Sequence, residues 1–284
     1  MNIDIICPLY NAEKYIRNLH KSLEMQKGVT INKYRYIVTK GTDNTEQILQ
    51  ELKIDYELIK PEEFSHALTR EKEAMKSNAD ILVFITQDII IKDEYWLYNL
   101  VKDIEKNECE ACYSRQICTN NTIEKYTREK NYPEESFVVT KKDINKLGLR
   151  TFFFSDASSA IKKNVFLELK GYDGKKLPIN EDMYIAYKLI MNNYRIKYCA
   201  ESKVIHSHRF TLKQIYKRYY DTGKFFKENS YLDNFKTNKT GGNLALYILK
   251  RAIQDKNVNV LINFIPNMSA RFLGMKKGKY DGRK

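Results

Sequence analysis

Short apolar segments alternate with helical patterns over residues 1–90, and this alternation limits the possible folds more than any other feature of the chain. Apolar residues recur at helical spacing after Asn11, which we expect to cap the first helix, then around Ile48–Leu52 and over about 65–77. The segments between them are predicted strands: Ile3–Cys7, Tyr34–Thr39, Tyr56–Ile59 and Ile81–Thr86. Such alternation predicts an α/β fold with a mostly parallel sheet flanked by helices.

The alternation weakens after residue 95, and residues 120–150 are polar. We expect helices over Asn164–Leu169 and Asp182–Asn192, with strands at Tyr194–Cys199 and Lys203–His206. The remainder, from Thr211, has helical patterns and many basic residues. The sequence therefore predicts an α/β domain over residues 1–210 and a helical, basic extension over residues 211–284.

Charge is concentrated in the last third of the chain. Residues 201–284 carry 18 Lys and Arg against 6 Asp and Glu, whereas residues 1–200 carry 31 against 30. This distribution favours anionic partners, such as a phosphorylated small molecule, nucleic acid or an acidic membrane surface. In the extension, basic residues alternate with aromatic ones around 213–227, a pattern equally typical of an ordinary helix with an aromatic core face.

The N-terminal apolar run is too short for a signal peptide, and no apolar stretch approaches the ~20 residues of a membrane span. Five scattered cysteines argue against a disulfide framework. Cys109, Cys112 and Cys118 have irregular spacing with no nearby histidine, so we expect thiols there rather than a zinc site. These features predict a cytoplasmic, reduced protein.

Ligands of open α/β sheets gather at the carboxyl ends of the strands. Asp88 follows the fourth predicted strand, where a carboxylate either holds a divalent cation or caps a turn. Glu181 and Asp182 begin a predicted helix, either as charges that complement the helix dipole or as a general base. His206 and His208 follow a strand at a spacing that suits metal ligands, although such histidines also form ordinary hydrogen bonds.

Several common catalytic motifs do not occur in the sequence. The chain has no Gly-x-Gly-x-x-Gly after the first strand and no Gly-x-x-x-x-Gly-Lys-Ser/Thr, which disfavours dinucleotide oxidoreductases and P-loop nucleotidases. It also lacks the Gly-x-Ser-x-Gly of serine hydrolases.

Seven further short motifs, in order along the chain, accompany an opening Ile5-Ile6-Cys7-Pro8-Leu9-Tyr10-Asn11 segment. They are Phe64–Arg70, Phe84–Asp88, Tyr113–Gln116, Asn131–Pro133, Ser155–Ser158, Asn180–Met183 and His206–His208. Together they resemble glycosyltransferase family 2, inverting enzymes with the GT-A fold, and within it bacterial rhamnosyltransferases. The resemblance runs from residue 3 to about 225.

The resemblance implies a role for each matching residue. Asp88 would contact a Mg²⁺ or Mn²⁺ ion and the sugar diphosphate, and His208 or His206 would complete that site. Asp182 would be the catalytic base, with Glu181 supporting it or competing for the role. The expected donor-binding residues are Pro8, Leu9, Tyr10, Thr39, Asp43, Arg70, Gln87, Asp88 and Asp156.

Three positions depart from the family pattern. Gln87 stands where many members have an acid, although the rhamnosyl branch commonly has Gln-Asp here. Thr39 replaces an aspartate that contacts the nucleotide base, and Glu71 replaces a frequent asparagine. These departures concern the identity of the nucleotide and sugar rather than the fold or the reaction class.

The resemblance implies transfer of L-rhamnose from dTDP-β-L-rhamnose to a hydroxyl of a lipid-linked oligosaccharide or cell-surface polysaccharide. The basic extension would face the inner surface of the cell membrane or acceptor phosphate, without binding nucleic acid; homo-oligomerisation is left open. The alternatives are a transferase for another nucleotide sugar such as a UDP-hexose, a non-catalytic nucleotide-sugar or polysaccharide-binding module, and a nucleic-acid binder suggested by the extension alone.

Overall fold

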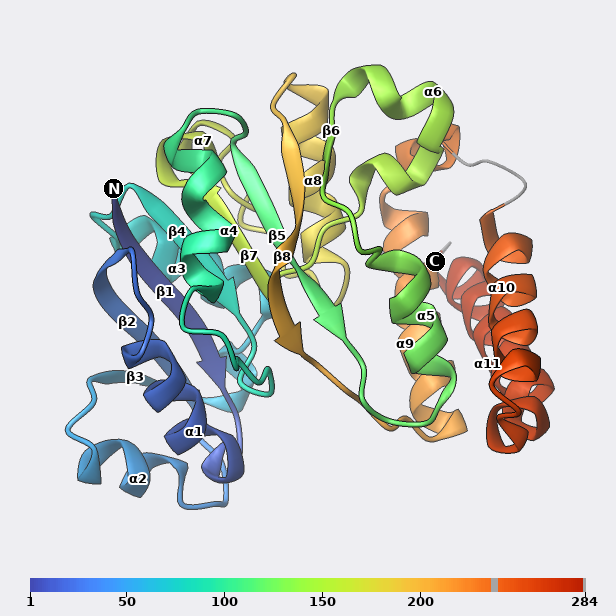
Figure 1. The fold of residues 1–284 in the computed structure, drawn as a ribbon, viewed down its shortest axis with the longest axis horizontal. Coiled ribbons are helices and arrows are strands. Elements are labelled where there is room, and N and C mark those ends of the chain that lie inside the picture. Colours follow the sequence, from blue (N-terminus) through green and yellow to red (C-terminus); the bar gives the residue numbers. More distant parts are fainter. Residues whose placement is uncertain (236–239, 283–284) are drawn as a thin grey trace.

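Eight strands form a single mixed sheet in the computed structural model, which describes residues 1–235 and 240–282 (Figure 1). Across the sheet the strand order is β3-β2-β1-β4-β7-β5-β8-β6. The strands are β1 (Asn2–Leu9), β2 (Thr30–Thr39), β3 (Tyr56–Ile59), β4 (Ile81–Ile85), β5 (Ala111–Ile117), β6 (Phe137–Val139), β7 (Ser158–Lys162) and β8 (Ile196–Ile205).

The first half of the sheet confirms the predicted βαβ alternation. Strands β1, β2, β3 and β4 pair in parallel, and their connections contain helices α1 (Glu13–Glu24), α2 (Thr45–Glu51) and α3 (His66–Lys76). The predicted cap of α1 is wrong, because Ala12 occupies the N-cap position. Asn11 instead has a φ of 46°, and its side-chain oxygen accepts a hydrogen bond of 2.9 Å from the backbone N–H of Thr42. This contact joins the loops that follow β1 and β2.

The second half of the sheet contains elements that the sequence pattern did not predict. Helix α4 (Trp96–Glu105) leads into β5, and β7 lies antiparallel between β4 and β5. The two strands predicted around 194–206 are one strand, β8, with a register shift opposite Ser114 and Arg115. β6 forms the antiparallel edge.

The remaining helices of this half are α5 (Ile123–Asn131), α6 (Ile144–Leu147), α7 (Lys163–Glu168) and α8 (Glu181–Met191). Short 3-10 turns lie at Pro61–Glu63, Lys141–Asp143, Gly148–Phe152 and Ser230–Phe235. The buried thiols of Cys109 and Cys112 are 3.2 Å apart, and neither cysteine forms a disulfide within the described residues.

A hydrophobic core covers each face of the sheet, because alternate strand residues point to opposite faces. Ile5 and Val83 belong to the core that α1, α2 and α4 cover. Ile6 and Phe84, their neighbours in sequence, belong to the core on the face covered by α3, α7 and α8. The two cores fix the strand register, and thereby the positions of the loops at the carboxyl ends of β1, β2 and β4.

Three helices follow the sheet: α9 (Leu212–Glu228), α10 (Thr240–Gln254) and α11 (Val258–Asp281). α11 packs along α9, and α10 packs against α5, at the end of the molecule away from β3 (Figure 1). A small third core joins Ile123 and Tyr126 of α5 to Ile248 of α10 and Val260 of α11. Within the described residues, no helix combines the length and apolar character that a membrane crossing requires.

Candidate active site

Three side chains that could hold a metal ion meet at the carboxyl ends of β4 and β8. The His206 Nε2 atom lies 3.4 Å from Asp88 Oδ1, and the His208 Nδ1 atom lies 3.6 Å from Asp88 Oδ2. One ligand atom from each of the three side chains lies within 4.8 Å of the other two. The strand order brings together residues that are more than a hundred positions apart in sequence.

Hydrogen bonding orients the His206 ring so that its Nε2 atom faces Asp88. Its Nδ1 atom lies 2.8 Å from the Gln116 side-chain oxygen, which also accepts a hydrogen bond from Arg128. The Gln116 amide nitrogen donates to the Ser155 hydroxyl at 2.8 Å, so the amide oxygen faces the imidazole. An imidazole that donates from Nδ1 leaves the Nε2 lone pair directed at Asp88. Two acceptors face each other there, an arrangement that fits a cation between them.

The imidazoles have the protonation state that a metal requires. Burial lowers the pKa of His206, and the positive charges of Arg128 and Arg218 add to that effect. Burial, together with His206, lowers the pKa of His208 to about 4. Desolvation opposes the ionisation of Asp88, but its contacts with His206 and His208 outweigh that effect and lower its pKa. At neutral pH the cluster is therefore one carboxylate with two neutral imidazoles, which are metal ligands.

Gln87, adjacent to Asp88, has a different function. Its amide oxygen accepts from the backbone N–H of Tyr10 at 2.7 Å, and its amide nitrogen donates to the Tyr10 carbonyl at 2.9 Å. The side chain thus continues the pairing of β1 with β4 beyond the ends of both strands. This contact holds the loop after β1 against the loop that carries Asp88.

Acidic side chains gather at the start of α8. Asn180 precedes the helix with a φ of 61°, in the left-handed region, and Glu181 and Asp182 form its first turn. The Glu181 carboxylate lies 3.3 Å from the guanidinium of Arg70, which is only 1% exposed. Arg70, expected to bind the donor, is therefore buried against Glu181.

Asp182 is held differently from Glu181. No ion pair to it occurs in the described part of the chain, and its Oδ1 atom accepts a hydrogen bond from the backbone N–H of Met183. Desolvation raises the pKa of Asp182 well above its ordinary value, and the charges of Glu181 and Asp156 raise it further. A carboxylate with a raised pKa is a stronger base once it has lost its proton.

Asp156 lies in the same acidic cluster but is fully engaged. Its two oxygens accept hydrogen bonds from the hydroxyls of Ser159, at 2.8 Å, and Tyr172, at 2.7 Å. Burial raises its pKa, although the charge of Arg70 acts in the opposite direction.

A short chain of contacts connects the acidic cluster to the histidines. Gln116 contacts His206 at one end and Ser155 at the other, and Ser155 is adjacent to Asp156. The charge of Arg218, on α9, acts on Asp182 as well as on both histidines, and its guanidinium lies 5.4 Å from the ring of Phe210. Electrostatically, the two groups of residues belong to one region.

Two arginines of this region were missed as site residues by sequence reasoning. Arg218 counted only as part of the basic extension, and Arg128 of the polar segment was not singled out. The Arg128 Nε atom is buried and has no hydrogen-bond partner within residues 1–235 and 240–282. Their only sequence signal is a basic residue inside a helix, which is usually solvated.

The residues expected at the nucleotide are held by the loops after β1 and β2. Pro8 is partly exposed, Leu9 is buried in the core, and the Tyr10 side chain is exposed. Thr39 is buried, and its hydroxyl has no hydrogen-bond partner among the residues that the structure describes. The Asp43 carboxylate accepts hydrogen bonds from Thr45 and from the backbone N–H of Glu13, so it joins α1 to α2.

The departure at Glu71 also has a structural explanation. Its carboxylate accepts hydrogen bonds from the backbone N–H groups of Tyr172 and, at 3.1 Å, Gly174. This contact fixes the turn between α7 and α8.

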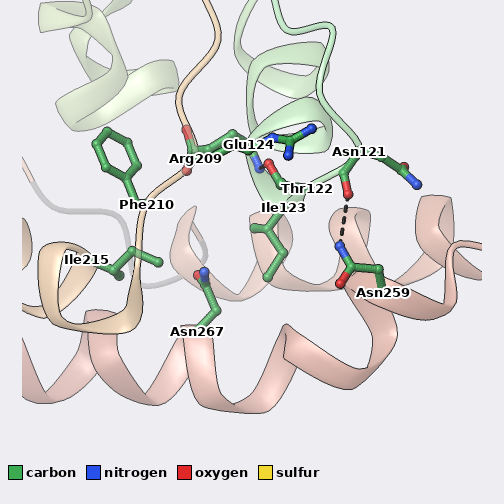
Figure 2. A pocket seen from close by; sticks show the side chains of 9 residues that line it. All are labelled: Asn121, Thr122, Ile123, Glu124, Arg209, Phe210, Ile215, Asn259 and Asn267. Carbon is green, nitrogen blue, oxygen red and sulfur yellow. Dashed lines mark hydrogen bonds between the residues drawn. The ribbon is translucent and has the colours of Figure 1, made fainter.

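A polar pocket of about 460 Å³ lies between α5, the loop after His208 and α11 (Figure 2). Its lining residues are Asn121, Thr122, Ile123, Glu124, Arg209, Phe210, Ile215, Asn259 and Asn267. The ring of Phe210 stacks on His208 with centroids 4.9 Å apart, so one wall of the pocket adjoins the Asp88 cluster. Neither Asp88 nor Asp182 lines this pocket.

The fold, together with the matching family model, defines a glycosyltransferase of the GT-A type. The model of Glycosyl transferase family 2 matches residues 4–170, and the chain belongs to that family. The O-antigen chain rhamnosyltransferase RfbN of Salmonella typhimurium is 32% identical over 99% of this chain and 90% of its own length. The O-antigen chain rhamnosyltransferase WbaN of Salmonella anatum is 31% identical, over 97% of this chain and 89% of its own.

Solved structures share the fold at low sequence identity. The mannosyltransferase PcManGT of Pyrobaculum calidifontis, in complex with GDP-Man and Mn²⁺, superposes with a TM-score of 0.63 at 14% identity, covering 99% of this chain and 86% of that one. TarS residues 1–349 of S. aureus, in complex with UDP-GlcNAc, superpose with a TM-score of 0.59 at 14% identity, covering 100% of this chain and 92% of that one.

Proposed function

We propose that this glycosyltransferase moves L-rhamnose from dTDP-β-L-rhamnose to a hydroxyl of a lipid-linked oligosaccharide or cell-surface polysaccharide, with inversion at the anomeric carbon. The similarity to two O-antigen chain rhamnosyltransferases over nearly the whole chain carries the choice of sugar. The Asp88 cluster and the acidic start of α8 supply the two kinds of group that such a transfer needs.

Asp182 is the proposed general base. It takes the proton from the acceptor hydroxyl, whose oxygen forms a bond to the anomeric carbon while the bond from that carbon to the diphosphate oxygen breaks. The electron pair of the broken bond leaves on the nucleoside diphosphate. Because Glu181 is paired with the buried Arg70, we assign it a supporting role and propose Asp182 as the base.

Asp88, His206 and His208 are proposed to hold a divalent cation. When bound, the ion stabilises the negative charge of the leaving diphosphate. Three protein ligands leave coordination positions for diphosphate oxygens. Two imidazoles with one carboxylate suit Mn²⁺ better than Mg²⁺, which prefers oxygen ligands. Arg128 and Arg218 add positive charge to the same region.

The polar pocket is the proposed acceptor subsite. Three asparagine side chains, Thr122 and Glu124 supply the donors and acceptors that sugar hydroxyls require, and Phe210 supplies an aromatic surface. Among the described residues, Arg209 has no hydrogen-bond or ion-pair partner, so its charge is available to an acceptor phosphate. We further propose the domain division at residue 210, with peripheral attachment to the inner face of the cell membrane.

The decisive experiment incubates the purified protein with Mn²⁺, a lipid-linked oligosaccharide acceptor and a panel of dTDP-, UDP- and GDP-sugars, and measures both the melting temperature and the release of nucleoside diphosphate. A ligand that binds only the folded protein raises the melting temperature. We expect dTDP-β-L-rhamnose to give the largest shift and to be turned over. A larger shift and faster turnover with a UDP-hexose would identify that sugar nucleotide as the donor instead of dTDP-β-L-rhamnose. Binding without any turnover would identify a non-catalytic module.

A further inference from the structure

Glycines fix the rotation of α11 about its own axis. A Cβ atom on Gly278 would lie 1.9 Å from the carbonyl oxygen of Tyr220, and one on Gly274 would lie 2.4 Å from that of Tyr216. On the facing helix, a Cβ on Gly223 would lie 2.4 Å from the carbonyl oxygen of Met275. α9 and α11 therefore pack backbone against backbone along this line. The close contact allows α11 only one orientation against the protein.

The opposite face of α11 is consequently turned to solvent, and it is largely apolar. Positions at spacings of three and four share one face of a helix. On this face they are Val258, Ile262, Ile265, Ser269, Phe272, Lys276 and Tyr280, all of them exposed. Ile262 and Ile265 are 70% and 73% exposed, values that leave most of each side chain in water.

α10 adds two residues of the same kind, Leu246 and Ile253, which are 67% and 58% exposed. Since α11 is held through its glycines, these large apolar side chains contribute little to the packing of the fold. Large exposed apolar patches on a protein usually indicate an interaction surface. We call the exposed apolar side chains of α11 the apolar face.

The charge of the two helices identifies the partner. Residues 240–282 contain seven basic residues and two acidic ones. Both acids form ion pairs, Asp255 with Lys125 and Asp281 with Lys277. By contrast, the exposed Lys250 and Lys276 have no ion-pair partner within the described residues. The apolar face is therefore accompanied by uncompensated positive charge.

We propose that the apolar face lies on an anionic phospholipid bilayer, with α11 parallel to the membrane plane. Its apolar side chains would enter the boundary between headgroups and acyl chains, and its lysines would contact lipid phosphates. A second copy of this chain fits less well, because a symmetric contact would bring two positively charged surfaces together. The inference deepens the proposed function, which places the enzyme at a membrane, but it requires no donor and no turnover.

The first test measures flotation of the full-length protein with two kinds of vesicle. One kind contains phosphatidylcholine alone, and the other contains phosphatidylcholine and phosphatidylglycerol in equal parts. We expect binding to the anionic vesicles that weakens as salt is added. The triple variant Ile262→Gln, Ile265→Gln, Phe272→Gln should lower the partition coefficient by about tenfold or more.

A matched control replaces three exposed apolar residues far from these helices, Met25→Gln, Leu58→Gln and Met75→Gln. It should float like the unaltered protein, and the melting temperatures of both triple variants should stay close to that of the unaltered protein. Equal loss of binding in both triple variants would contradict the assignment of the surface.

A second test uses the single tryptophan of the chain. Trp96 is fully buried, so brominated lipid should not quench its fluorescence. The Ile265→Trp variant should be quenched by anionic vesicles that contain brominated acyl chains, whereas a Met25→Trp variant should not. No quenching of the Ile265→Trp variant, or a dimer in solution that Ile265→Gln dissociates, would overturn the proposal. The transferase assignment would stand in either case, because vesicle binding is measured without donor and without turnover.

Discussion

The guanidinium of Arg70 lies 3.3 Å from the carboxylate of Glu181, whereas Asp182, the next residue, has no such partner in the described part of the chain. Two adjacent acids at the start of α8 are thus in different electrostatic environments. Glu181 forms an ion pair with a buried arginine, whereas desolvation raises the pKa of Asp182. This difference leads to the first two predictions.

Asp182→Asn should lower kcat by about 10²- to 10⁴-fold, the usual contribution of a general base, while leaving donor affinity nearly unchanged. Transfer assays and donor titration by calorimetry measure the two quantities. Turnover close to that of the unaltered enzyme would exclude Asp182 as the base.

Glu181→Gln should act mainly on stability. It removes one charged partner of the buried Arg70, and we expect a loss of about 1.5–3 kcal/mol in the free energy of unfolding. Urea unfolding measures this loss. Once folded, the variant should retain most of its kcat, and a loss as large as that of Asp182→Asn would indicate that Glu181 takes part in proton transfer.

The pH dependence of transfer should report the environment of Asp182. Because desolvation raises the pKa of this carboxyl, kcat should fall on the acidic side at a pH above the ordinary aspartate value of about 3.9. The charge of Arg218 opposes that rise. Arg218→Gln should therefore move the acidic limb to higher pH, whereas Lys217→Gln, a change at an exposed lysine paired with Asp221, should not move it.

Replacement of either histidine should change the metal requirement. His208→Ala removes one of three ligands, so we expect the Mn²⁺ concentration for half-maximal activity to rise by about tenfold or more. For the unaltered enzyme, Mn²⁺ should support a higher rate than Mg²⁺. An activation curve for Mn²⁺ that is unaltered by His208→Ala would remove this residue from the cation site.

The glycine contacts between α9 and α11 predict a stability effect with its own control. Gly278→Ala places a methyl group against the Tyr220 carbonyl and should cost about 1–3 kcal/mol, measured by urea unfolding. In α10, the methyl group of Gly242→Ala meets no atom of the described residues within 4 Å, and the change should stabilise the protein slightly, by about 0.5–1 kcal/mol. Similar effects at both positions would contradict the close packing of the two helices.

Sequence patterns predicted the first half of the sheet because β1 and β4 are almost continuous apolar runs, buried on both faces. They did not predict β5 or β7. Within these strands Ser114, Gln116 and Ser158 form side-chain hydrogen bonds, and polar residues break the apolar signal. Antiparallel insertion of β7 also depends on long-range pairing, which local periodicity does not contain.

In the candidate site, too, the sequence predicted some residues and missed others. Asp88, His206 and His208 were predicted because they stand at strand ends within motifs that keep the family order, and the structure brings them together. Arg128 and Arg218 were missed because the local sequence does not indicate whether a basic side chain on a helix faces solvent or a binding site. Only packing of α5 and α9 beside the sheet brings their charges to the histidines.

Both polar atoms of the Gln87 amide form hydrogen bonds with the backbone of Tyr10. It is therefore not available to an ion, and Asp88 is the single anion of the cluster. One negative charge attracts a divalent cation less strongly than two, so much of the attraction must come from the diphosphate itself. The metal and the sugar nucleotide should consequently arrive as a preformed complex, or bind with mutual reinforcement, rather than in two independent steps.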